Sequence, residues 1–331
     1  MKQLNDQTRV LVTGATGFIG RHLVDSLAEK KVPLRLMCRS LSKSGQFFSE
    51  DQDIVIGDLS HIEKIREAMQ GCDWLINVAG CYRFGPSAEK DLIQSNVHGL
   101  QNLLEIWKEA DRSGRFIHVS TAGFWEQGDD GTFSQADLPD WSYYKKSKSA
   151  GEALVQSAIA DGMDAVIVNP SCPIGEGDDT PTPTGKMIFD YVRGHFPVSC
   201  HTGINLIHIN DLVEGILHAA ESAPSGGPII FGDENLWIHE ILERLAKLTG
   251  KSRPLFTAPG GLVRIMGEIG EAIDTYQPGF TDRTQLCRET AWLSGRTQFF
   301  SLDQQYRDLG WKPKRGVDQA LRESVGWYQQ D

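Results

Sequence analysis

Residues 10–20, VLVTGATGFIG, constrain the fold more than any other stretch of this chain. An apolar run typical of a strand breaks into three glycines at G-x-x-G-x-x-G spacing, and residues 18–30 continue with helical periodicity. A glycine-rich turn between a strand and a helix is typical of the start of a β-α-β unit. Three glycines can also form a turn that only joins a strand to a helix. The segments that follow therefore have to show whether this turn binds a phosphate.

Apolar runs typical of strands alternate with helical segments through the first 170 residues. Further strands are expected at 34–38, 53–57, 74–80, 115–121 and 164–170, and helices at 61–71, 91–110 and 142–160. The strands lack polar alternation, as strands buried on both faces of a parallel sheet do. The sequence therefore predicts an α/β fold of the Rossmann type, a doubly wound parallel sheet with a smaller, mostly helical C-terminal lobe.

The alternating pattern thins after residue 171. Residues 170–185, PSCPIGEGDDTPTPTG, read as a loop at the carboxyl edge of the sheet, where ligands bind in such folds. We assign residues 8–178 to the sheet domain and expect 204–232, with strands at 205–209 and 228–232, to return to it. Residues 179–203 and 233–331 are assigned to the smaller lobe, which we expect to bind substrate.

Composition argues against several classes of function. Lys and Arg total 33 against 44 for Asp and Glu, and this acidic, unclustered balance of −11 disfavours binding to nucleic acid or an anionic membrane. No apolar run approaches the ~18 residues of a membrane span, and the start MKQLNDQTRV lacks a signal-peptide core. Six scattered cysteines indicate free thiols in a cytoplasmic protein, and nine histidines without ligand spacing predict no metal site.

In this context the glycine turn predicts a dinucleotide site. Gly14 allows the tight turn, Gly17 lets a pyrophosphate approach the backbone, and Gly20 lets the helix pack closely. The helix start adds free N–H groups and the positive end of its dipole. The residues assigned to this part of the site are Gly14, Thr16, Gly17, Phe18, Ile19 and Gly20.

The end of the second strand indicates which dinucleotide is bound. NAD-binding proteins usually carry a carboxylate there for the ribose 2′-OH, whereas an arginine accommodates a 2′-phosphate. This chain has Cys38 and Arg39 at that point, so NADP(H) is favoured and NAD(H) stays open. Asp58, followed by Leu59, could accept a hydrogen bond from the adenine amino group or cap the next helix.

A second set of residues indicates proton chemistry. Tyr144 and Lys148 stand four apart on one predicted helix, so their side chains project from the same face. A nearby cation favours the phenolate of a tyrosine, whose ordinary pKa near ~10 makes it a poor base at neutral pH. Thr121, at the end of the strand HVST, could hold a substrate oxygen while Tyr144 exchanges its proton. Tyr143 lacks a lysine at this spacing.

TGATGFIG, NVAG, NVHGLQNLL, HVST, YYKKSK and VNPSCPIG, in this order, resemble an extended short-chain dehydrogenase/reductase of the NAD-dependent epimerase/dehydratase family. Within it the chain is similar to the dihydroflavonol-4-reductase-like branch and to bacterial hopanoid-associated sugar epimerases. AGCYRFG, GINLIHINDLVEG and FFSLDQQYRDLGWKPKRG carry this closer similarity.

The resemblance implies roles for individual residues. Tyr144 matches the catalytic acid/base, Lys148 the lysine on the nicotinamide ribose, and Thr121 the Ser/Thr beside the substrate carbonyl, with Ser120 as a second candidate. Asn96 matches an asparagine tied to a backbone distortion and a proton relay, with plain helix packing as the alternative. Further cofactor contacts fall on Ala79, Gly80, Asn169, Pro170 and Ser171, and Arg39 matches the arginine of NADPH-using reductases. Thr121 replaces a more usual serine, and Trp-Glu in GFWEQG replaces Tyr-Gly, which disfavours a nucleotide-sugar substrate.

The residues expected to contact a small carbonyl or alcohol substrate are Tyr82, Arg83, Phe84, Thr184 and Lys186. Arg83 could hold a carboxylate or phosphate, or be taken up by a salt bridge. Three functions stay open: an NADPH-dependent carbonyl reductase, an NAD-dependent epimerase or dehydratase, and a non-catalytic dinucleotide sensor. A sensor would not need the tyrosine and lysine that this chain keeps. A homodimer is one assembly open to the chain.

Overall fold

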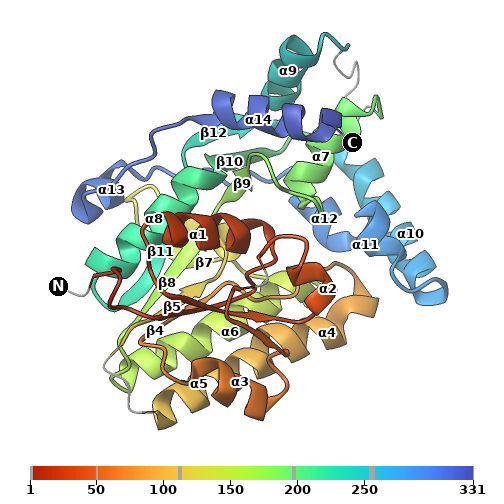
Figure 1. Cartoon of the computed structure of the whole chain (residues 1–331). Coiled ribbons are helices and arrows are strands. Elements are labelled where there is room, and N and C mark those ends of the chain that lie inside the picture. The colour runs from red at the N-terminus through yellow and green to blue at the C-terminus, as the bar shows by residue number, and fades with distance from the viewer. Residues whose placement is uncertain (1–2, 50, 111–113, 196–198, 253–257, 331) are drawn as a thin grey trace.

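The central sheet of the computed structural model has seven parallel strands in the order β11-β8-β5-β4-β1-β2-β3 (Figure 1). The structure describes residues 3–49, 51–110, 114–195, 199–252 and 258–330. The strands span β1 Val10–Thr13, β2 Leu34–Cys38, β3 Ile54–Ile56, β4 Trp74–Asn77, β5 Phe116–Val119, β8 Ala165–Pro170 and β11 Gly226–Phe231. The predicted doubly wound sheet is confirmed.

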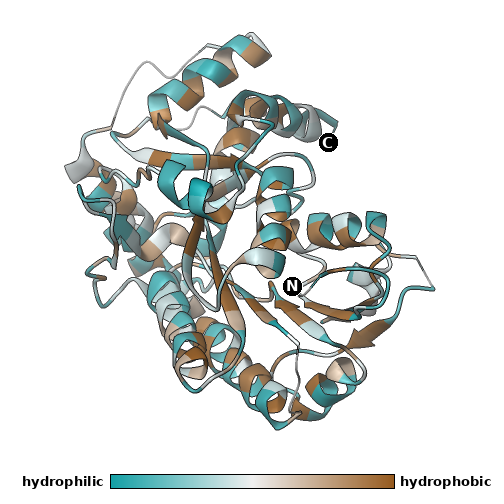
Figure 2. Ribbon diagram, turned by 90° about the vertical axis from the view of Figure 1, so that its left-hand side faces the viewer, coloured by the Kyte–Doolittle hydropathy of each residue, from teal (hydrophilic) through white to brown (hydrophobic). Residues whose placement is uncertain are grey.

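Helices cover both faces of this sheet (Figures 1 and 2). One face carries α1 (Phe18–Glu29) and α8 (Ile209–Ser222), and the other carries α3 (Ile62–Met69), α5 (Gly99–Glu109) and α6 (Tyr143–Ala160). Side chains of β1 alternate between the two layers, with Val10 and Val12 in one core and Leu11 in the other. This double burial explains why the strands read as continuous apolar runs.

The helix expected at 91–110 is one helical run with a distortion in its middle. It begins with a 3₁₀ turn at Pro86–Ala88 and α4 (Glu89–Ile93), passes through a π-helical turn at Gln94–His98, and continues as α5. Single π turns inside α-helices often mark functional sites, and Asn96 lies within this one.

The second lobe is built on a small sheet of order β12-β10-β9. Its strands are β9 Cys172–Ile174, β10 Gly203–His208 and β12 Glu234–Trp237, and α7 (Pro183–Val192), α9 (Ile238–Thr249) and α14 (Val317–Gln330) close a separate apolar core around Tyr191. The remaining elements of the described residues are α2 Leu41–Ser44, 3₁₀ Ala122–Phe124, β6 Trp125–Gln127, β7 Phe133–Gln135, the long helix α10 Gly260–Tyr276, α11 Phe280–Thr284, α12 Arg288–Leu293 and α13 Asp303–Leu309.

The structure corrects the expectation that all of 204–232 returns to the main sheet. Strand β11 does so beside β8, but β10 pairs with β9 in parallel and with β12 in antiparallel orientation in the small sheet. An apolar run such as NLIHI fits a buried strand in either sheet, so the pattern alone cannot choose between them. The deciding partner, β9, lies within the segment read as a loop.

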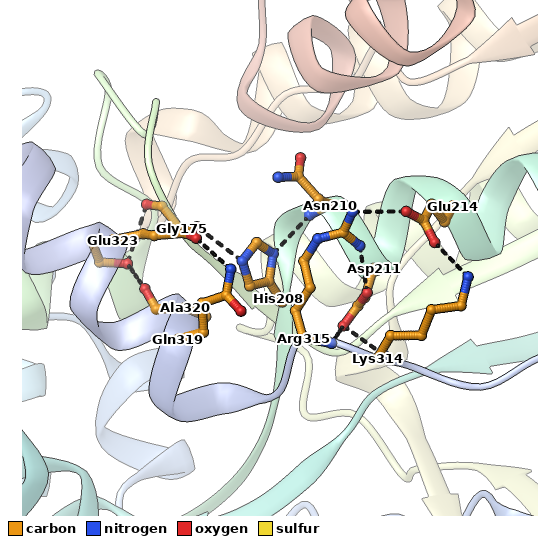
Figure 3. A network of polar contacts seen from close by, with 11 residues as sticks. Gly175, His208, Asn210, Asp211, Glu214, Lys314, Arg315, Gln319, Ala320 and Glu323 are labelled. Atoms are coloured by element: carbon orange, nitrogen blue, oxygen red, sulfur yellow. Dashed lines mark hydrogen bonds and ion pairs between the residues drawn. The ribbon is translucent and has the colours of Figure 1, made fainter. Parts of the chain in front are cut away.

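A polar network fixes α14 against β10 and α8, shown in Figure 3. His208 accepts a hydrogen bond at Nδ1 from the Asn210 backbone N–H (3.0 Å), and its Nε2 lies 2.8 Å from Glu323 Oε2. The fully buried carboxylate of Asp211 accepts hydrogen bonds from the backbone N–H groups of Lys314 and Arg315 and pairs with the Arg315 guanidinium at 2.7 Å. These contacts hold the two lobes together.

Candidate active site

The glycine turn has the geometry that a close approach of backbone requires. Gly14 has φ +72°, and a Cβ there would lie 2.5 Å from the Ala79 nitrogen. At Gly20 a Cβ would lie 2.2 Å from the Gly14 oxygen, so α1 can pack on the turn only without a side chain. At Gly17 the nearest atom would be the same oxygen at 3.3 Å, and the residue borders a cavity. The missing side chain at Gly17 therefore leaves room for a ligand.

This cavity, about 560 Å³, runs along the loops that follow β1, β2, β3 and β4. A second cavity, about 230 Å³, continues from the turn toward β5 and α6. All predicted cofactor residues except Gly20 and Asn169 line one or both: Gly14, Thr16, Gly17, Phe18, Ile19, Arg39, Asp58, Leu59, Ala79, Gly80, Lys148, Pro170 and Ser171. The two cavities together form a channel of the elongated kind that a dinucleotide fills.

The far end of the channel is cationic. Arg39 and Lys43 line it beside Cys38, whose thiol has a pKa raised to about 11 by burial and therefore carries no charge at neutral pH. Asp58 also borders the cavity, but its Oδ1 accepts a hydrogen bond from the Ser60 backbone N–H at 2.8 Å. Asp58 thus closes the turn before α3 but does not cap that helix, whose N-cap residue is His61 without a side-chain cap.

Tyr144 lines the other end of the channel. Burial raises the pKa of its phenol, the nearby Glu289 carboxylate adds to that effect, and a hydrogen bond with the Thr121 hydroxyl opposes it. The Tyr82 ring packs edge-on against the Tyr144 ring with centroids 4.4 Å apart. Tyr144 and Thr121 both line the channel and the adjoining cavity, so a proton on Tyr144 can reach either space. At neutral pH the phenol is protonated.

Lys148 lies deeper, 7% exposed, and its Nζ donates a hydrogen bond to the Val119 carbonyl at 3.1 Å. Burial lowers the pKa of this ammonium to about 8, against the attraction of the Glu152 carboxylate. A Cβ on Gly80 would lie 3.8 Å from this Nζ, so the ammonium borders the channel where a ribose would pass. Tyr144 and Lys148, the predicted pair, both project from α6 and line the same end of the channel.

The predicted residue Asn169 holds the buried carboxylate of Glu152. The Asn169 side chain donates hydrogen bonds to Glu152 Oε2 (2.7 Å) and to the Thr121 carbonyl (3.2 Å), and Ser120 also faces Glu152. The Asn169 side chain is therefore turned away from the channel, which its neighbours Pro170 and Ser171 line. Thr121 lines both cavities, whereas Ser120 borders only the channel.

Asn96 uses its whole side chain to position other groups. Its Oδ1 accepts from the Cys81 backbone N–H (2.7 Å), and its Nδ2 donates to the Cys81 carbonyl (3.0 Å) and to Ser147 Oγ (2.9 Å). The π-helical turn thus ties the loop after β4 to α6 between Tyr144 and Lys148. A role of Asn96 in proton relay stays a prediction.

Glu289 is a site residue that sequence reasoning missed. From α12 it caps the start of α6: Oε1 accepts from Ser142 Oγ (2.9 Å) and the Lys145 N–H (3.2 Å), and Oε2 accepts from the Tyr144 N–H (3.3 Å). Burial raises the pKa of this carboxyl, and these hydrogen bonds oppose the rise. The residue stands 145 positions from Tyr144, so no local pattern could have revealed the contact.

A cavity of about 240 Å³ opens beyond Tyr144 and Thr121 toward the second lobe. Its wall is mainly apolar and includes three predicted substrate residues, Tyr82, Phe84 and Thr184. The other two are engaged elsewhere, because Arg83 pairs with both Asp91 and Asp282, and Lys186 pairs with Asp190 at 2.8 Å. Lys145, Arg296, Met187, Ile204, Leu293 and Phe300 line the cavity without having been predicted.

The cysteines and the metal-ligand residues add no further centre to this site. All six cysteines are free, and no cluster of potential metal ligands occurs within the described ranges. Among the helices described, none combines the length and the apolar character needed to cross a bilayer.

Comparisons with known proteins agree with this architecture. The profile of the NAD dependent epimerase/dehydratase family matches residues 10–231. The chain is 30% identical to a putative dihydroflavonol 4-reductase from Synechocystis sp., over 96% of this chain and 94% of that protein. It is 26% identical to sterol demethylase protein B from Methylococcus capsulatus, over 97% and 98% of the two chains.

Solved structures extend the comparison to the fold. The crystal structure of gox2253 matches with a TM-score of 0.79 and 28% identity, covering 98% of each chain. A UDP-glucose 4-epimerase from Thermotoga maritima, solved with UDP-glucose, matches with a TM-score of 0.76 over 98% of this chain and 99% of that one. At 15% identity the second match supports the fold alone.

Proposed function

The chain belongs to the NAD dependent epimerase/dehydratase family, and within it we propose an NADP(H)-dependent carbonyl reductase, or alcohol dehydrogenase in reverse. One observation carries the proposal: Tyr144 and Thr121 border both the dinucleotide channel and the apolar cavity. A nicotinamide in the channel and a carbonyl carbon in the cavity would meet at this tyrosine. The bound cofactor supplies the hydride, and the protein positions the carbonyl and supplies the proton.

The preference for NADP(H) is inferred from charge at the far end of the channel. A 2′-phosphate adds negative charge to the adenosine, and Arg39 and Lys43 are the cations that line the cavity beside β2. Cys38 offers no carboxylate for a ribose 2′-OH, and its raised thiol pKa keeps it neutral. Charge-assisted hydrogen bonds to phosphate are about twice as strong as neutral ones, so this end favours the phosphorylated cofactor.

The protonation state of Tyr144 suits the reducing direction. Its raised pKa keeps the phenol protonated, so it can donate to the oxygen of a carbonyl being reduced. Thr121 would hold that oxygen, and the Lys148 ammonium would stabilise the phenolate left after transfer. Asn96 and Glu289 would keep the geometry, because they fix α6 on either side of Tyr144.

The apolar wall of the cavity favours a hydrophobic carbonyl compound over a sugar. Met187, Ile204 and Leu293 supply no hydrogen-bond donors for hydroxyl groups. Relatives bearing reductase, dehydrogenase or sterol-directed names support the same substrate class. The alternative is an NAD-dependent epimerase, which the family description and the fold of the solved epimerases support.

The test is net consumption of NADPH with a panel of hydrophobic ketones and aldehydes, with alcohol formation quantified alongside. We expect the purified protein to be largely free of nucleotide and to oxidise one NADPH per alcohol formed. Tyr144→Phe should reduce turnover by roughly a hundredfold or more, while the matched control Tyr143→Phe, at a residue outside all three site cavities, should retain it. Firmly bound NAD together with interconversion of sugar isomers without net cofactor use would reverse the proposal in favour of an epimerase.

A further inference from the structure

The substrate cavity has a cationic end formed by Lys145 and Arg296. Lys145 follows Tyr144 on α6 and is 6% exposed, with its Nζ 5.0 Å from the centre of the Trp292 ring. The Arg296 guanidinium lies over the same ring, 3.7 Å from its centre. Both residues line the substrate cavity and also a neighbouring surface groove of about 440 Å³. They therefore stand where the cavity opens toward solvent.

The Lys145 side chain is only 6% exposed, and its ammonium borders the cavity without a matching anion in contact. Within the described ranges its Nζ makes no ion pair or hydrogen bond, only the ring contact with Trp292. Burial lowers its pKa to about 8; Glu289 opposes that change and Arg296 adds to it. The Glu289 oxygens are occupied by the start of α6, where the helix dipole and two backbone N–H groups already balance their charge. A buried ammonium left unpaired is costly, which indicates that a ligand completes it.

The charge count at this end points to a single negative charge. Two monocations face the cavity, and Arg296 is already paired with the half-exposed Glu126 at 3.3 Å. One positive charge therefore stays uncompensated, which suits a carboxylate better than a phosphate dianion. The rest of the wall is mainly apolar and includes Tyr82, Phe84 and Leu293.

We propose that the substrate is an apolar carbonyl compound bearing a carboxylate, held by Lys145 and Arg296 while its carbonyl group faces Tyr144. The inference rests on the proposed function for the identity of the reacting group, but the carboxylate subsite stands on its own geometry. Because Lys145 and Tyr144 are consecutive on one helix, the anion also sets which carbonyl of a substrate reaches the tyrosine.

The test compares small aryl keto acids with their methyl esters, using 4-acetylbenzoate and phenylglyoxylate as probes. Isothermal titration of the full chain, with and without excess NADP⁺, should show at least one acid binding tenfold or more tighter than its ester. Lys145→Met should remove that preference without weakening ester binding. Lys146→Met is the matched control, because Lys146 is exposed and pairs with Asp140 at 2.6 Å, and it should behave as the wild type does.

Two outcomes would overturn the subsite: no acid in the panel preferred over its ester by the wild-type protein, or a preference that survives in Lys145→Met. Lys145→Gln, which keeps a polar end group, provides a second variant if the methionine variant does not fold, and it should lose the preference too. The preference for acids without NADPH turnover would refute the reductase proposal and leave the subsite standing. If acids and esters were both turned over and bound with equal affinity, the carboxylate subsite would be refuted and the reductase proposal would stand.

Discussion

The buried Lys148 ammonium, which lies near Tyr144, should lower the free energy of unfolding of the protein. Its ordinary pKa of 10.5 falls to about 8 on folding, with burial as the main cause. At about 1.4 kcal/mol for each tenfold change in proton affinity, this fall corresponds to roughly 3 kcal/mol of unfavourable free energy at pH 7. The nearby titratable groups are Glu152, whose charge favours the ammonium, and His118, whose pKa burial and Lys148 both lower.

Lys148→Met removes this charge with a side chain of similar length. At pH 7 the variant should gain about 3 kcal/mol and lose roughly 1.5–3 kcal/mol with the hydrogen bond to Val119. The change of this stability difference with pH is a more specific test than its value at a single pH. Between pH 8 and 10.5 the unfolded wild-type chain binds the lysine proton and the folded chain does not, so wild-type stability rises with pH there. The stability of the variant relative to wild type should therefore fall by roughly 2–3 kcal/mol between pH 7 and pH 10.

Urea unfolding of both proteins at pH 7 and pH 10 measures this double difference. Other groups that titrate over this range are shared by the two chains and cancel in the subtraction. Lys146→Met, at an exposed lysine, should show no such pH-dependent difference from wild type. A variant that differs from wild type by the same free energy of unfolding at both pH values would show that Lys148 keeps its ordinary pKa in the folded protein.

Two further substitutions test the ends of the site. Arg39→Asp should reverse the preference for NADPH over NADH in fluorescence titrations, because it places a carboxylate beside the ribose; an unchanged preference would remove Arg39 from the cofactor site. Glu289→Ala should lower the free energy of unfolding by roughly 1–3 kcal/mol, because two buried N–H groups of α6 lose their acceptor. An unchanged free energy of unfolding would show that these hydrogen bonds from α6 do not contribute to stability.

The parts of the fold that the sequence predicted are those carried by local pattern. Strand β2 has the expected bounds, Leu34–Cys38, because a short apolar run between a helix and a glycine- or proline-containing turn has few alternatives. The glycine turn was predictable for the same reason, since Gly14 has a backbone conformation that other residues rarely adopt. Tyr144 and Lys148 share a face of α6 because helical spacing places them there.

The parts that escaped prediction depend on contacts between distant segments. The small sheet forms because the chain leaves the main sheet after β8 ends at Pro170, and β9 then pairs with β10. The composition of neither strand encodes this pairing. Glu289 reaches α6 from another lobe, and Lys145 becomes a cavity residue only because Trp292 and Arg296 fold over it. In the sequence, Lys145 looks like any solvated lysine beside the catalytic motif.

The most direct test of the account is a crystal structure of the protein with NADPH. We expect the adenosine 2′-phosphate within hydrogen-bond reach of Arg39 or Lys43, the pyrophosphate on the turn at Gly14–Gly17, and the nicotinamide between Tyr144 and the loop at Ser171. The cavity bordered by Tyr82 and Lys145 should open directly above the nicotinamide ring. A 2′-phosphate pointing into solvent, or a nicotinamide separated from Tyr144 by protein, would contradict the assignment of this channel and of Tyr144 to an NADP(H)-dependent reductase.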